Sequence, residues 1–300
     1  MENAGAQAAK VLDARQSRRD RVWRFFRTWP VLPLAILTVL ISCALFAPLI
    51  APHDPLVGDL RAPTMQPAWY PEGSSKYLIG TDTLGRDILS RVIFGARISL
   101  IVAAVVLGLG AVGGSLFGLV AGYYGGQVDE VLMRFVDFTL AVPFILIALV
   151  VVIVLGQSLT VIIVLLAVFG WGGFARQVRA ETLSLRTRDY VALAKVAGAG
   201  TAQILYRHIL PGVVNTLIVV ATLRVGTLIL TESILSFLGV GVPPPTPSWG
   251  SMVSDGRDYL DTAWWISFAP GLAIFLTVLG FNFLGDWMRD RFDPRLRQLV

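Results

Sequence analysis

The chain has 300 residues, of which 55% are hydrophobic and only 15% are charged, and its net charge is +5 at pH 7. Water-soluble domains carry roughly 25% charged residues, so this composition excludes an ordinary soluble protein. The basic excess does not indicate a nucleic-acid partner, because the basic residues gather at the ends of apolar runs. Several runs hold about 20 apolar residues, enough to cross roughly 30 Å of hydrocarbon. The sequence therefore predicts an all-α integral membrane protein in contact with the lipid bilayer.

The N-terminal part of the chain divides into three segments. Residues 1–29 are polar and rich in Arg, which is typical of a cytoplasmic tail. Residues 30–50 form the first apolar run, which is too long for the apolar region of a cleaved signal peptide and predicts a retained membrane anchor. Residues 51–94 contain repeated prolines and polar residues, and they predict an extracytoplasmic segment.

Residues 95–286 are predicted to form the transmembrane domain. Its apolar runs indicate five further spans, at about 99–122, 138–155, 160–174, 212–237 and 264–284. A polar loop at 176–211 joins two of these spans, and residues 287–300 form a polar tail. With the N-terminus inside, the inner segments hold 18 Lys and Arg residues and the outer segments hold 6. Cytoplasmic loops are enriched in these residues, so we expect six spans with both termini in the cytoplasm.

Glycines recur every fourth residue in the second predicted span, at Gly110, Gly114, Gly118 and Gly122. This spacing keeps small residues on one stripe of a helix, which lets a second helix approach closely. Each glycine costs helix propensity, so the pattern predicts a helix-packing face. The alternative is that membrane helices are simply rich in glycine.

Two ionisable residues, Arg224 and Glu232, lie well inside the fifth predicted span. They are separated by about 80° around the helix and about 12 Å along it, so they share one broad face, and Thr231 lies between them. Charged residues are costly in lipid and usually face a protein or water-filled interior. This face therefore predicts the wall of a translocation path or a gate. Packing against a partner helix is the alternative, and both interpretations stay open.

The polar loop contains a short helix signal, with the sequence DYVALAKVAGAG at 189–200. We expect Asp189 to cap the helix and Gly198 to end it in a left-handed conformation. A second short helix follows from Thr201, and Pro211 suits the first turn of the next span. The first helix is apolar on most faces, so it needs a surface to pack against.

Motifs for catalysis and for metal binding are missing from the sequence. No Lys follows a Gly, so the chain has no phosphate-binding loop of the Gly-Lys type, and any ATP must be bound by another chain. The only histidines, His53 and His208, are expected on opposite sides of the membrane, and Cys43 lies in an apolar run. We therefore expect no catalytic residue and no metal site.

The loop resembles a known motif, and four other stretches strengthen the resemblance. DYVALAKVAGAG with the following ILYRHILP is similar to the cytoplasmic "EAA" loop of permease subunits of binding-protein-dependent ABC importers. The further matches are GTDTLGRDILSR at 80–91, ILSFLGVG at 234–241, PPPTPSWG at 243–250 and NFLGDWMRDRFDPRLR at 282–297. Together they resemble the C-type permease subunit of dipeptide, oligopeptide and nickel ABC importers, over nearly the whole chain except about the first 25 residues.

The resemblance implies a type I ABC importer permease fold in the inner membrane of a bacterium or archaeon. It implies a second, homologous permease chain, two ATP-binding subunits that hold ATP and Mg²⁺, and an extracytoplasmic substrate-binding protein. This chain would bind no cofactor and would import peptides, with nickel chelates or glutathione-type peptides as alternatives. The coupling residues would be Asp189, Tyr190, Ala192, Leu193, Ala194, Lys195, Gly198, Gly200 and Pro211.

The chain departs from the family motif in one place. Ala192-Leu193-Ala194 stands where the family has Glu-Ala-Ala. The missing Glu would complete a capping box with the residue that caps the helix, so the helix is expected to dock through shape and apolar contact more than through charge.

Two other classes of protein compete with this interpretation. An ion-driven secondary transporter would show inverted repeats or broken helices with paired acidic sites, and the sequence offers a single acid in mid-span. An intramembrane enzyme would need a catalytic constellation within the spans.

Overall fold

The computed structural model describes residues 30–292, so the predicted tail 1–29 and the end of the tail 287–300 lie outside the described residues. Within 30–292 the regular structure is helical, and the β pairing is limited to two isolated bridges, at Gly58–Arg86 and Thr81–Asp87. The helices are α2 Val31–Leu45, α3 Ala47–Ile50, α4 Ile88–Tyr124, α5 Gly126–Ala141, α6 Phe144–Leu155, α7 Leu159–Leu185, α8 Asp189–Val196, α9 Thr201–Gln203, the π-helix η1 Ile204–Ile209, α10 Leu210–Phe237, α11 Trp249–Gly256, the 3-10 helix η2 Arg257–Tyr259, and α12 Trp265–Phe292.

Four helical segments of the described chain are long and apolar enough to cross a membrane: α4, α7, the continuous segment from α9 to α10, and α12. The pair α5 and α6 passes the same test as one span bent by 76°. The 15-residue α2 is apolar but shorter, about 22 Å at 1.5 Å per residue. The protein is therefore an all-α membrane protein, as predicted.

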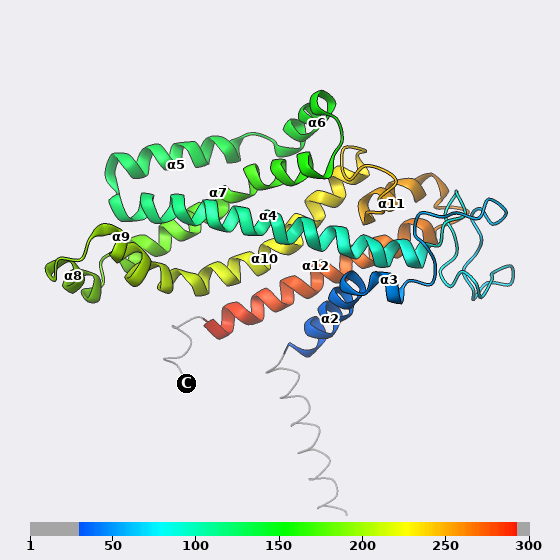
Figure 1. Ribbon diagram of the computed structural model, residues 1–300, viewed down its shortest axis with the longest axis horizontal. Helices are drawn as coiled ribbons and strands as arrows, with labels where there is room; N and C mark the ends of the chain where they lie inside the picture. Colours follow the sequence, from blue (N-terminus) through cyan, green and yellow to red (C-terminus); the bar gives the residue numbers. More distant parts are fainter. Residues whose placement is uncertain (1–29, 293–300) are drawn as a thin grey trace, which may run out of the picture.

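The long helices run side by side along the longest axis of the molecule (Figure 1). The short helices α8 and α9 lie at one end of this bundle, and α11 lies at the other end with the irregular segment 51–87 (Figure 1). Helix α4 packs along α7, while α10 packs along α12. The two ends of the bundle are therefore built from different segments of the chain.

Four helices extend well beyond the spans that the sequence predicts: α4, α5, α7 and α12, the last of which continues to Phe292 into the predicted tail 287–300. Helix α4 begins at Ile88, because the Asp87 carboxylate accepts a hydrogen bond from the backbone N–H of Ser90 and caps the helix there. Helix α7 continues to Leu185, well past position 174. Its polar extension is held by Arg176 and Arg179, whose guanidinium groups pair with carboxylates of α5. Apolar length thus underestimates helices whose ends are stabilised by polar contacts.

The predicted span 138–155 is broken in the structure. Helix α5 ends at Ala141, Val142 is extended, and α6 starts after Pro143. Proline has no backbone N–H to donate and disfavours helical geometry in the residue before it. The apolar run therefore continues in sequence across a turn of the backbone.

Candidate functional site

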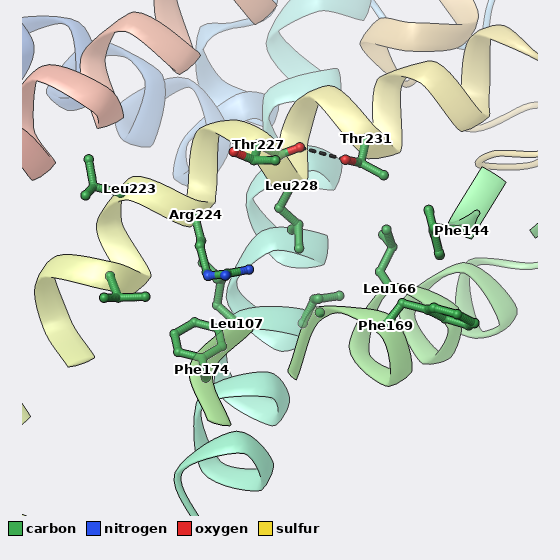
Figure 2. Close-up of a pocket in the computed structure, with 13 residues that line it drawn as sticks. Leu107, Phe144, Leu166, Phe169, Phe174, Leu223, Arg224, Thr227, Leu228 and Thr231 are labelled. Atoms are coloured by element: carbon green, nitrogen blue, oxygen red, sulfur yellow. Dashed lines mark hydrogen bonds between the residues drawn. The ribbon is translucent and has the colours of Figure 1, made fainter. Parts of the chain in front are cut away.

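A cavity of about 540 Å³ opens among α4, α6, α7 and α10 (Figure 2). Its wall is apolar and aromatic except for three residues of α10, namely Arg224, Thr227 and Thr231. Pockets for small molecules have volumes of roughly 300–1,000 Å³ and combine apolar walls with a few polar groups. The other lining residues are Val106, Leu107, Phe144, Leu166, Phe169, Gly170, Phe174, Val220, Leu223 and Leu228.

Arg224 is the only charged residue among those that line this cavity. Its guanidinium carbon lies 5.2 Å from the centroid of the Phe174 ring, a distance typical of a cation–π contact. A Cβ atom at position 173 would overlap the guanidinium, so Gly173 provides the space that the side chain occupies. Within residues 30–292, Arg224 has no ion pair or hydrogen bond. The cavity therefore holds a cation without a resident anion.

The two threonines lie on the same stripe of α10 as Arg224, three and seven residues further along. The hydroxyl of Thr231 donates to the backbone carbonyl of Thr227 at 2.8 Å (Figure 2). The Thr227 hydroxyl has no partner among the described residues. Arg224, Thr227 and Thr231 thus form a polar strip along α10 in the otherwise apolar wall of the cavity.

Glu232 does not line the cavity, although the sequence groups it with Arg224 and Thr231. Its side chain is 1% exposed, and its Oε1 accepts a hydrogen bond from the Ser236 hydroxyl at 2.7 Å. The Ser236 oxygen in turn accepts from the backbone N–H of Val242 at 3.2 Å. This carboxylate therefore connects the end of α10 to the loop that follows it.

The glycine stripe of α4 faces α7. A Cβ at Gly114 or Gly118 would lie 2.5 Å from a backbone carbonyl oxygen of α7, and one at Gly122 would lie 2.7 Å from the Cβ of Thr182. At Gly110 the nearest atom is at 3.6 Å, an ordinary contact. Three of the four glycines thus allow the close approach of the two helices.

Helix α8 projects from one end of the bundle (Figure 1). Val191 is fully buried against the bundle, whereas Leu193 and Val196 are 69% and 88% exposed. At the C-terminal end Gly198 has φ +82°, and Ala199 N–H donates to the Ala194 carbonyl at 3.0 Å. These are the features of a glycine-ended helix.

The prediction that Asp189 caps this helix is wrong. Arg188 occupies the capping position with extended backbone and no side-chain cap, and Asp189 is the first helical residue. The Asp189 carboxylate still lies in the first turn, where a negative charge is favourable. Counted from Arg188, Ala192 is the fourth helical residue, so a Glu there would not form the capping box that we expected.

The other residues predicted to take part in coupling lie in or near α8. Tyr190, Leu193, Ala194 and Gly198 line a shallow depression together with residues after the glycine turn. The Lys195 ammonium lies 5.2 Å from the centroid of the Tyr123 ring at the end of α4. Gly200 precedes α9, and Pro211 lies in the first turn of α10. No break separates α9 from α10, because the π-helix η1 joins them.

A charged cluster at the opposite end of the bundle was not predicted. The Arg86 Nε atom lies 2.7 Å from an oxygen of the buried Asp82, which lies 3.6 Å from Nη1 of the buried Arg91. Asp255 of α11 lies 3.9 Å from Arg91 Nη2. Burial raises the pKa of the Asp255 carboxyl, and the charge of Arg91 opposes this. The signal for this cluster is the set of four charges in GTDTLGRDILSR at 80–91, a stretch that we interpreted only as a family motif.

A bundle of apolar helices around a mostly apolar cavity with one arginine in its wall, and with a projecting helix at one end, is typical of a membrane transport component. Residues 114–298 match the family described as binding-protein-dependent transport system inner membrane component. The chain belongs to this family, which confirms the predicted ABC importer permease class, its inner-membrane location and its non-catalytic role.

Relatives match nearly the whole chain. It is 40% identical to the di/tripeptide transport system permease protein DppC of Pseudomonas aeruginosa, over 88% of this chain and 87% of the relative. It is 40% identical to the dipeptide transport system permease protein DppC of Haemophilus influenzae, over 92% and 94%. It is 43% identical to the glutathione transport system permease protein GsiD of Escherichia coli, over 92% and 90%.

A solved structure has the same fold. The inward-facing MetNI methionine ABC transporter aligns with a TM-score of 0.55 at 20% identity, covering 71% of this chain and 98% of that chain. This similarity supports the predicted importer permease fold.

Proposed function

We propose that this chain is one of two permease subunits of an ATP-driven importer of short peptides. The substrate class rests on the relatives named as dipeptide and di/tripeptide permeases, which match nearly end to end. The proposed partners are a homologous permease, two ATP-binding subunits that hold ATP and Mg²⁺, and an extracytoplasmic substrate-binding protein.

The proposed topology has six spans with both termini in the cytoplasm. The distribution of Lys and Arg supports it. The separation of α8 and α11 at opposite ends of the bundle agrees with it (Figure 1). In this topology α2 and α3 together make the first crossing, and the bent pair α5 and α6 makes the third.

One observation carries the coupling role: α8 exposes apolar side chains in a chain that has no phosphate-binding loop of its own. Leu193 and Val196 are largely exposed, while Val191 fixes the helix to the bundle. Exposed apolar residues on a projecting helix suit a groove in a partner. We infer that α8 docks on an ATP-binding subunit and that the turn at Gly198 sets its direction.

The cavity beside α10 is the proposed path. Arg224 and Thr231 belong to its wall. Glu232 acts on the path through a gate, because it holds the end of α10 to the following loop.

The experiment is ATP-dependent uptake by the complete importer, purified through a tag on this chain and reconstituted in liposomes. Uptake of a labelled dipeptide should require internal ATP and the binding protein, and should persist when ionophores remove ion gradients. Uptake that follows an ion gradient without ATP would favour a secondary transporter and refute the proposal.

Glutathione is the second candidate substrate. The 43% identity to GsiD over 92% of this chain is as extensive as the identity to the dipeptide permeases. Uptake of labelled dipeptide can be measured in the presence of unlabelled dipeptide, glutathione or a nickel chelate. The strength of inhibition by each competitor then ranks the three candidate substrates.

A further inference from the structure

The strongest unexplained feature of the cavity is the charge of Arg224. Charged residues inside a span are costly and are normally paired, yet this guanidinium has only the Phe174 ring as a described partner. A ring face provides weaker compensation than an anion does. An anion that arrives from outside the chain would complete the site.

We propose that Arg224 is a specificity-determining residue that binds the terminal carboxylate of a peptide in the cavity. This inference rests on the proposed function and deepens it by naming the group that the path recognises. A planar guanidinium can bind a carboxylate through two parallel hydrogen bonds while its face stacks on an aromatic ring. The ring of Phe174 and the space above Gly173 hold the guanidinium in such an orientation.

The remaining walls fit a peptide in an extended pose along α10. Thr227 lies one turn from Arg224, and its hydroxyl is free of described partners. Thr231 lies about 10 Å from Arg224 along the helix. Phe144 and Phe169 supply aromatic surface at that end of the cavity (Figure 2). A carboxylate at Arg224 would therefore leave the peptide's polar groups near hydroxyls and its side chains near apolar surface.

A carboxylate of the second permease chain is the competing partner for Arg224. The cavity in front of the guanidinium favours a small molecule, since about 540 Å³ remains open around it. None of the lining residues is acidic, so the cavity attracts anions in its present form. Pairing with the second permease chain becomes an outcome of the test.

Equilibrium binding of labelled Ala-Phe and of its C-terminal amide to the complete importer separates these possibilities. The measurement uses the complex in nanodiscs without the binding protein, so that only the membrane part selects. We expect Ala-Phe to bind about tenfold more tightly than the amide, the scale of one charge-assisted pair. Arg224→Met should remove this preference, and Arg224→Lys should keep part of it. The control Arg134→Met removes an exposed cation of α5 and should behave as wild type.

Equal binding of acid and amide by the wild type, or no binding of either, overturns the inference, as does a preference that survives Arg224→Met. Separation of the two permease chains in Arg224→Met also overturns it and assigns the arginine to subunit pairing. Import of peptides by the wild type can succeed while these tests fail, so failure here differs from failure of the proposed function.

Discussion

The guanidinium of Arg224 and the ring of Phe174 face each other across two helices, with 5.2 Å between the guanidinium carbon and the ring centroid. Phe174 is buried, so it provides a fixed surface. The adjacent Gly173 leaves room for the guanidinium. The position of the Arg224 guanidinium in the cavity thus depends on the absence of a side chain at Gly173.

Gly173→Ala should displace Arg224 without removing its charge. The new Cβ would occupy the space of the guanidinium, so the arginine must leave the Phe174 ring. We expect the affinity for Ala-Phe, measured in nanodiscs without the binding protein, to fall about tenfold, within the range for lost hydrogen bonds to a charged group. Gly108→Ala is the matched control, because no atom lies within 4 Å of its added Cβ. Unchanged affinity in Gly173→Ala would show that peptide binding does not need the space that Gly173 leaves for the guanidinium.

The all-helical fold and the approximate positions of the long helices could be predicted, because runs of apolar residues are visible in the sequence itself. The break at Pro143 was missed, although the proline was visible, since an apolar run can continue through a turn. The polar extension of α7 was also missed. This extension packs on α4 through the buried Val178 and Thr182. It also pairs with α5 through Arg176 and Arg179, and only the folded chain brings these contacts together.

The candidate site, too, could be predicted only in part from the sequence. The sequence correctly selects Arg224 as unusual, but it cannot separate the surroundings of Arg224 from those of Glu232. About 80° of rotation between them is enough to put one in the cavity wall and the other against its own loop. Phe174 and Gly173 could not be found from sequence, because their role comes from a second helix. The cap of α8 was misplaced by one residue, a scale at which helix ends are poorly determined.

Gly118→Ala should weaken the contact between α4 and α7. Its Cβ would lie 2.5 Å from the backbone carbonyl oxygen of Ala175, and backbone atoms cannot move aside without shifting the helix. Overpacking of this kind typically costs about 1–3 kcal/mol, which thermal unfolding of the purified complex would show as a lower transition temperature. Gly113→Ala, on an open face of the same helix, should leave the transition unchanged or raise it slightly through helix propensity. Equal effects of the two substitutions would argue against a specific packing stripe.

Gly198→Val should separate the permease from its ATP-binding subunits. The backbone at Gly198 has φ +82°, a conformation that costs other residues roughly 1–2 kcal/mol and more when they are β-branched. We expect less ATP-binding subunit to copurify with the tagged chain and slower ATP-driven uptake. Gly198→Asn should reduce both by less, because Asn tolerates this conformation. Full association and uptake in Gly198→Val would refute the role given to this turn.

The proposed gate at Glu232 can be tested with a double-mutant cycle. The Val242 N–H donates to the Ser236 oxygen, and the Ser236 hydroxyl donates to the Glu232 carboxylate. Glu232→Leu should lower the free energy of unfolding by about 1–3 kcal/mol, since the buried Ser236 hydroxyl loses its acceptor. Glu232→Gln keeps an oxygen at Oε1 and should cost less. In Glu232→Leu with Ser236→Ala both partners are gone, so the combined loss of stability should be smaller than the sum of the single losses.

Thermal unfolding and uptake, measured on the wild type, Glu232→Leu, Glu232→Gln, Ser236→Ala and the double variant, separate the gate from a role for the charge. If Glu232 acts by holding the loop, uptake should follow stability across the set, and Glu232→Gln should transport almost normally. Loss of uptake in a stable Glu232→Gln protein would instead assign a role to the carboxylate charge. Additive losses of stability would show that Ser236 and Glu232 contribute independently, which the 2.7 Å hydrogen bond between them does not predict.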